Sequence, residues 1–191
     1  NLKQLGPPEQ YHQLNQEIQR ECRRAKEQYY EEKCLLERRL EKQKKTYLVF
    51  VDYTKAFDRV NHTKLESILS DAGIPPHERK LITQLYWNQT ATVRTSAGCT
   101  EKIKIQRGVR QGCILSPALF NLYSEYLLNE ALEDCTGISI GGTQVTNLRY
   151  ADDTVLLADC KEDLQEMLNK LCDTCKIYRM QLNAKKTKTM S

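Results

Sequence analysis

The sequence predicts an α+β domain in which an antiparallel sheet carries helices on one face, preceded by a long N-terminal helix. Short apolar runs separated by glycine or aspartate turns predict hairpins at 91–107, 138–145 and 145–158. Two stretches, 116–132 and 164–175, repeat apolar residues at helical spacing. Helices and hairpins follow one another without regular strand-helix alternation, which favours an antiparallel over a parallel sheet.

Length and composition limit the choice of protein class. A chain of 191 residues can bury roughly 70% of its unfolded surface in one domain, so we expect no second full domain. The net charge of +4 agrees with a nucleic-acid partner but is common in other proteins. No apolar run is long enough to span a membrane and no secretory signal is found. We therefore expect an intracellular protein of the nucleus or cytoplasm, not a secreted one.

The first element is a charged segment at 9–45 that lacks glycine and proline. Its apolar residues recur at three- and four-residue steps, which predicts a long amphipathic helix. Recurring arginines and lysines would suit nucleic-acid binding or self-association through 9–45, whereas their near-balance with glutamates favours a packing arm. We divide the chain into a charged helical arm at 1–45 and a second region at 46–191.

A strand is predicted next at 46–52, where a continuous apolar run stops at Asp52. Such a run is typical of a strand that is covered on both faces. A carboxylate there is costly unless it lies at the strand end and binds a partner. Asp52 is therefore a candidate functional residue.

Two helices and a hairpin follow. A capping-box pattern from Thr63 to Glu66 predicts a helix at 63–72, and Pro75-Pro76 starts another that ends near residue 86. Alternating residues then predict the hairpin at 91–107.

The segment from Gly108 leads into the next helix. Gly112 has no Cβ, so a ligand can approach the backbone there. Ser116 offers a capping hydroxyl and Pro117 suits the first helical turn. We expect a buried helix over 116–132 that supports a site.

Two adjacent carboxylates, Asp152 and Asp153, lie where the hairpin at 145–158 should turn. Aspartates are good turn residues in any protein, so this pair alone decides nothing. Asp52, at the end of another buried strand, favours a shared metal site instead. Two divalent ions about 3.5–4 Å apart are typical of phosphoryl transfer. Magnesium suits such carboxylates best, with Mn²⁺ as a substitute.

The chain from about residue 47 to 190 resembles the palm of reverse transcriptases, specifically those of non-LTR (LINE-type) retrotransposons. Four motifs carry the resemblance in the family's order: VDYTKAFD at 51–58, GVRQGCILSP at 108–117, YADD at 150–153 and QLNAKKTK at 181–188. Together the four motifs are highly specific.

The resemblance implies the role of each site residue. The metal ligands would be Asp52, Asp152 and Asp153. The nucleotide-binding residues would be Phe57, Arg110, Gln111 and Gly112. Phe57 would be the steric gate beneath the sugar. Lys186, which matches the motif better than Lys185, would protonate the leaving pyrophosphate.

The resemblance also implies the activity and its partners. The chain would be an RNA-directed DNA polymerase palm that extends a DNA primer on an RNA template with deoxynucleoside triphosphates. The stretches that build the fingers and thumb in the family are largely missing, so we expect a palm fragment that is weak or inactive alone. The alternative is a non-catalytic retroelement remnant that acts as a nucleic-acid-binding or protein-interaction module.

Other metal-binding and catalytic patterns are weaker. Cys172 and Cys175 have zinc-ligand spacing but lie in a predicted helix, which favours a core-facing thiol pair. His12, His62 and His77 lie in polar surroundings without a partnered nucleophile, so we expect surface residues.

Overall fold

The computed structural model describes residues 45–96, 98–140, 142–150 and 153–190, together with residues 20, 23, 26, 27, 30, 33, 34 and 37. The long helix predicted for 9–45 lies mostly outside these residues. Asp152 also lies outside them. The predicted division at residue 45 remains a proposal.

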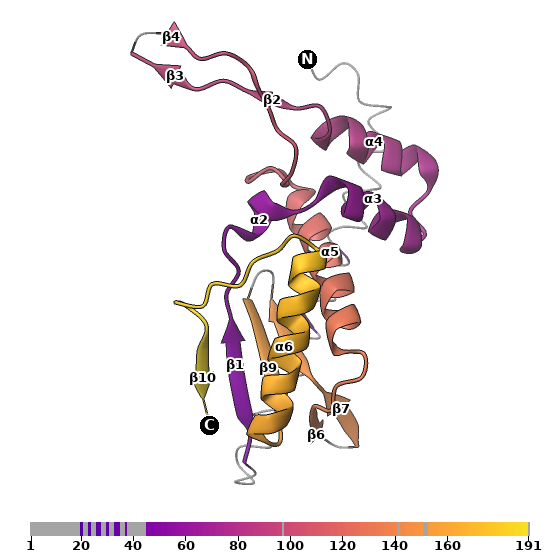
Figure 1. Cartoon of the computed structure of the whole chain (residues 1–191). Helices are drawn as coiled ribbons and strands as arrows, with labels where there is room; N and C mark the ends of the chain where they lie inside the picture. The colour runs from indigo at the N-terminus through magenta and orange to yellow at the C-terminus, as the bar shows by residue number, and fades with distance from the viewer. Residues whose placement is uncertain are drawn as a thin grey trace.

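A four-stranded antiparallel sheet forms the centre of the fold (Figure 1). Its order is β10 (Lys188–Met190), β1 (Tyr47–Val51), β9 (Asp153–Ala158) and β8 (Asn147–Tyr150). The strand predicted at 46–52 therefore lies inside the sheet, between β10 and the hairpin β8–β9. Its last predicted residue, Asp52, follows β1 directly.

Two long helices, α5 (Ser116–Leu132) and α6 (Lys161–Ile177), supply the main core with one face of this sheet. Alternate strand residues such as Val49, Val51 and Leu156 point toward them and are nearly inaccessible to solvent. The predicted α+β class, with helices packed on one face of an antiparallel sheet, is confirmed.

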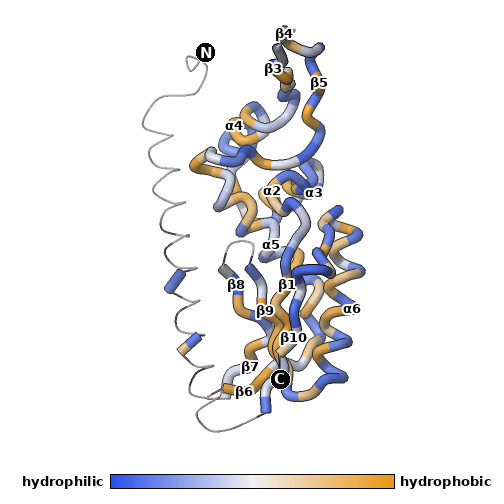
Figure 2. Tube along the Cα trace, turned by 90° about the vertical axis from the view of Figure 1, so that its left-hand side faces the viewer, coloured by the Kyte–Doolittle hydropathy of each residue, from blue (hydrophilic) through white to orange (hydrophobic). Residues whose placement is uncertain are grey.

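Among the described residues, the opposite face of the sheet is covered at one end. The hairpin of β6 (Ile138–Ile140) and β7 (Thr143–Val145) packs there against Leu48 and Leu157. Figure 2 shows this hairpin and α6 on opposite sides of the apolar sheet. Phe50, two residues further along β1 on the same face, is 42% exposed. The expectation that β1 is covered on both faces is therefore wrong near Asp52, because the hairpin does not extend that far.

The remaining elements lie beyond the Asp52 end of the sheet (Figure 1). They are α2 (Ala56–Arg59), α3 (His62–Asp71), α4 (Pro76–Tyr86), β2 (Thr90–Ala91), β3 (Arg94–Thr95), β4 (Gly98–Cys99) and β5 (Ile103–Lys104). Because β2 pairs with β5 and β3 pairs with β4, the predicted hairpin at 91–107 is confirmed as two short ladders. It projects away from the body of the domain.

Three local predictions are corrected. Asn61, not Thr63, caps α3, because its side chain accepts a hydrogen bond from the Lys64 amide at 2.9 Å. Ser116 does not cap α5, since Leu115 is the N-cap and makes no side-chain capping bond. His62 is not a surface residue. It is 6% exposed, and its ring stacks on Trp87 at 4.5 Å between centroids.

The interpretation of the cysteine pair on α6 holds for Cys175, which is 2% exposed, while Cys172 is half-buried. Within the described ranges, no helix is both long and apolar enough to cross a bilayer.

Candidate functional site

Two of the predicted carboxylates meet at one end of the sheet. Val51 of β1 pairs with Thr154 of the antiparallel strand β9, so Asp52, which follows Val51, lies next to Asp153, which precedes Thr154. Tyr150 of β8 pairs with Asp153 of β9, so the predicted hairpin at 145–158 is present and the pairing of its two strands extends to these two residues. The side chain of Asp52 is 33% exposed and Asp153 is exposed. Both acids are therefore open to a ligand from solvent.

The third predicted metal ligand, Asp152, lies outside the described residues. In the part of the chain that the structure covers, no group of three or more histidine, cysteine or acidic side chains could hold a metal ion. The described donors are thus two aspartates on neighbouring strands at one end of the sheet. Such hard oxygen donors suit Mg²⁺, which takes a few carboxylates and completes its shell with water and phosphate.

The fourth motif packs along the first. Tyr53 and Leu182 form an antiparallel bridge. The amide of Asn183 donates to the carbonyl of Asp52 at 2.7 Å, and the amide of Thr54 donates to the Gln181 carbonyl at 2.8 Å. These backbone bonds fix the start of the fourth motif beside the carboxylate pair.

A tight turn then directs Lys186 back toward Asp52. The Asn183 carbonyl accepts hydrogen bonds from the amides of Lys186 and Thr187 and from the Thr187 hydroxyl, at 2.9–3.0 Å. The Lys186 Nζ lies 3.9 Å from Asp52 Oδ2, although 69% of the lysine side chain is exposed. An exposed pair of this kind contributes little to stability. Its importance is therefore the position of an ammonium group next to a carboxylate.

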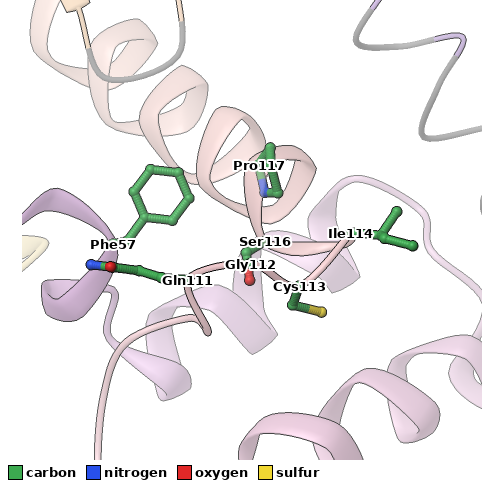
Figure 3. A pocket seen from close by; sticks show the side chains of 7 residues that line it. All are labelled: Phe57, Gln111, Gly112, Cys113, Ile114, Ser116 and Pro117. Atoms are coloured by element: carbon green, nitrogen blue, oxygen red, sulfur yellow. The ribbon is translucent and has the colours of Figure 1, made fainter.

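A pocket of about 410 Å³ joins the first motif to the second (Figure 3). Its lining residues are Phe57, Gln111, Gly112, Cys113, Ile114, Ser116 and Pro117. Three of the four predicted nucleotide-binding residues are thus brought together. The fourth, Arg110, does not line the pocket. Its side chain is exposed and donates from Nε to Gln89 Oε1 at 3.0 Å.

Phe57 is held rigidly at the edge of this pocket. Its helix, α2, starts after Lys55, which has a left-handed backbone with φ of 51°. The Phe57 ring stacks on Phe120 of α5, with centroids 4.8 Å apart and planes inclined by 18°. Because Phe120 is fully buried, the core of the domain fixes the orientation of Phe57.

The first and second motifs are also joined through their backbones. Gly108 and Val109 donate their amides to the carbonyls of Val60 and Phe57, at 2.8 and 2.9 Å. A Cβ at Gly108 would lie 3.0 Å from the backbone oxygen of Asp58, and its φ is +94°. Only glycine allows this approach without strain.

Gly112 has a different role. Its φ of +81° favours glycine, yet a Cβ there would meet nothing within 4 Å. This agrees with the prediction that its backbone is open to a ligand. The neighbouring Gln111 amide lies 3.5 Å from Asp58 Oδ1, a weak link back to α2.

Sequence reasoning missed the polar residues behind the pocket. Tyr86 was predicted only as part of an apolar helix face, but its hydroxyl contacts Cys113 and Ser116. A buried tyrosine usually pairs its hydroxyl, and that chemistry was the available signal. Burial raises the pKa of the Tyr86 phenol. Burial alone would raise the pKa of Cys113, but hydrogen bonds from Tyr86 and from backbone amides outweigh it and lower this pKa.

These geometric features agree with the sequence comparisons. The family model described as "Reverse transcriptase (RNA-dependent DNA polymerase)" matches residues 2–191. The chain belongs to the reverse transcriptase family. The resemblance that the four motifs predicted is therefore confirmed.

Curated relatives place the chain among the proteins of non-LTR retrotransposons. It is 39% identical over 153 residues to a Pol polyprotein of the type-1 retrotransposable element R2 from Popillia japonica, covering 78% of this chain and 21% of the relative. It is 30% identical over 158 residues to the RNA-directed DNA polymerase of the mobile element jockey from Drosophila funebris. That match covers 77% of this chain and 16% of the relative. The chain thus spans about a fifth of the length of these relatives.

Solved telomerase structures share the fold. Apo telomerase from Candida tropicalis superposes with a TM-score of 0.69 at 14% identity, over 94% of this chain and 36% of that one. Telomerase from Candida albicans, in complex with a fragment of telomeric RNA, superposes with a TM-score of 0.64 at 14% identity. The superposition covers 77% of this chain and 27% of that one. At such identities the likeness concerns the fold alone, and it supports the predicted polymerase palm.

Proposed function

We propose that this chain carries the polymerising centre of an RNA-directed DNA polymerase from a non-LTR retrotransposon. One observation carries the proposal: in a chain of the reverse transcriptase family, the pairing of β1 with β9 sets Asp52 next to Asp153 at the end of the sheet. Its partners would be an RNA template, a DNA primer and deoxynucleoside triphosphates.

In this proposal Asp52, Asp152 and Asp153 hold magnesium, in two ions, and manganese can replace it. Bound ions would supply activation of the primer hydroxyl and neutralisation of phosphate charge. The juxtaposition of Asp52 and Asp153 supports this donor set, since both are accessible oxygen donors at the same end of the sheet, on neighbouring strands.

The residues of the chain would position and protonate the reactants. The primer 3′-hydroxyl attacks the α-phosphate, a new phosphorus–oxygen bond forms, and the bond to pyrophosphate breaks. Phe57 would lie under the sugar, and Gln111 and Gly112 would face the base pair that forms. Lys186, whose ammonium lies near Asp52, would donate a proton to the leaving pyrophosphate.

Arg110 remains a proposed nucleotide contact on separate grounds. Its bond to Gln89 turns it away from the pocket lining. We therefore propose that it meets the outer part of a nucleotide or the template, where its charge would attract phosphate.

Primer extension on an RNA template with Mg²⁺ tests the proposal. It should use the chain itself and any longer reading frame that contains it. We expect Asp52→Asn and Asp152→Ala to lower the rate by roughly 10³-fold, since bound metals contribute several kcal/mol to such reactions. Asp173→Asn is the matched control, because Asp173 is an exposed acid on α6 that pairs with Lys176.

A second readout does not depend on activity. Mn²⁺ binding, followed by the loss of the free-ion paramagnetic resonance signal, should weaken in Asp52→Asn and stay unchanged in Asp173→Asn. Equal extension and equal binding in both variants would falsify the catalytic proposal.

A further inference from the structure

The Tyr86 hydroxyl lies behind the wall of the pocket, in contact with two of its lining residues. It donates to Cys113 Sγ at 3.1 Å and lies 3.0 Å from Ser116 Oγ. Tyr86 and Ser116 are each 1% exposed, so neither hydroxyl can exchange these partners for bulk water. Tyr86 belongs to α4, whereas both partners belong to the second motif.

The same contacts hold the loop at 110–116 in shape. The Ser116 hydroxyl donates to the Arg110 carbonyl at 2.5 Å and so joins the two ends of the loop. Within the loop, the amide of Cys113 donates to the Arg110 carbonyl, and the amide of Ser116 donates to the Cys113 carbonyl, both at 3.2 Å. Hydrogen bonds within the loop therefore join its two ends, and the Tyr86 phenol connects it to α4.

The position of Gln111 and Gly112 depends on this fastening. Both residues line the pocket and both are exposed, and in the described chain the side-chain link from Gln111 to α2 is a weak one of 3.5 Å. The stronger hydrogen bonds of the loop lie on its buried side. Ser116 and Cys113 make these bonds, and Tyr86 orients both.

We propose that Tyr86 is a positioning residue for the nucleotide pocket, which holds the loop at 110–116 so that Gln111 and Gly112 face an incoming nucleotide. This inference rests on the proposed function and extends it to a residue of α4. The single proton of Ser116 goes to the Arg110 carbonyl, so the single proton of Tyr86 serves both Cys113 Sγ and Ser116 Oγ as acceptors. Phenylalanine keeps the ring but leaves both partners without this bond.

Tyr123 provides a matched comparison. It is also fully buried, and its hydroxyl donates to the Tyr178 carbonyl at 2.6 Å. That bond joins α5 to the end of α6 and does not involve the loop at 110–116. Tyr86→Phe and Tyr123→Phe therefore both remove one buried hydroxyl, but only the first touches the pocket.

Steady-state primer extension distinguishes positioning from simple destabilisation. In Tyr86→Phe we expect the KM for the deoxynucleoside triphosphate to rise about tenfold, equivalent to 1.4 kcal/mol, with kcat within twofold. Tyr123→Phe should lower Tm by about as much as Tyr86→Phe does, because each variant loses one buried hydroxyl. The KM of Tyr123→Phe should not change. Equal KM values in both variants would overturn the inference.

Alkylation of Cys113 provides a test that needs no activity. The groups that act on this thiol are the Tyr86 phenol, the Ser116 side chain and the amides of Leu115 and Ser116, and Arg110 acts on the phenol. Iodoacetamide labelling against pH, read by peptide mass spectrometry, should show a higher midpoint for Cys113 in Tyr86→Phe than in the wild type. Cys135, whose pKa is raised by burial, serves as the internal reference.

The two tests separate the inference from the function on which it rests. An unchanged Cys113 midpoint in Tyr86→Phe would overturn the inference whether or not the chain polymerises DNA. A shifted midpoint in a chain and reading frame that lack all activity would support the contact network and overturn the polymerase proposal.

Discussion

Lys186 reaches Asp52 because a turn centred on the Asn183 carbonyl folds the fourth motif back on the first. We expect Lys186→Gln to lower kcat by about 10²-fold, the lower range for loss of a general acid. Lys185→Gln removes the same charge one residue earlier and should stay within twofold of the wild type. Single-turnover extension measures both, and equal losses in the two variants would exclude a specific role for Lys186.

Phe57 gives a second prediction for a single residue. Its ring is fixed by Phe120 at the edge of the pocket, so a smaller side chain would open space where a ribose 2′-hydroxyl could fit. Phe57→Val should increase ribonucleotide incorporation relative to deoxynucleotides by roughly tenfold or more. Phe57→Tyr keeps the bulk and should continue to reject ribonucleotides. The measurement is competitive extension with both nucleotide types.

The residues of the site differ in how far sequence could predict them. Asp52 and Phe57 lie in one short motif, and the end of a buried strand already favoured a functional Asp52. The contacts of Tyr86 join residues 27 and 30 positions apart, and no local spacing indicates such pairs. The burial of His62 escaped prediction for the same reason, because it depends on Trp87 and on the Gly108 carbonyl.

Among the secondary-structure elements, the β6–β7 hairpin depends on Gly137. A Cβ at this position would lie 2.2 Å from the Val145 carbonyl oxygen, which is far too close. Gly137→Ala should destabilise the fold by about 3 kcal/mol, the upper range for overpacking. At Gly142 a Cβ meets nothing within 4 Å, so Gly142→Ala should cost only about 1 kcal/mol of backbone strain. Urea denaturation of both variants gives the comparison, and equal losses would contradict it.

The elements themselves were predictable from periodicity, but their boundaries and surroundings were not. Helix α3 begins at His62 because Asn61, two residues before the expected cap Thr63, is the N-cap. The apolar run of β1 predicted cover on both faces, yet Phe50 is 42% exposed. Where a distant hairpin folds back on a sheet is a tertiary property that the strand sequence does not contain.

For the whole molecule, the charged segment gives a prediction about association. We propose that 9–45 mediates contact between copies of the chain. Sedimentation of the full chain should then give a mass above the monomer, and a chain lacking residues 1–45 should sediment as a monomer. Circular dichroism of the shortened chain is the control for folding. A monomeric mass for both chains would count against the arm as an association element.

The sheet end that carries the acids has a further consequence for variation in this chain. Side chains alternate between the two faces of a strand, and Tyr150 and Asp153 enclose a connection of only two residues. Insertion of a single residue that slips β9 by one position would reverse the orientation of every following side chain. The loop should therefore tolerate exchange of Ala151 far better than any change in its length.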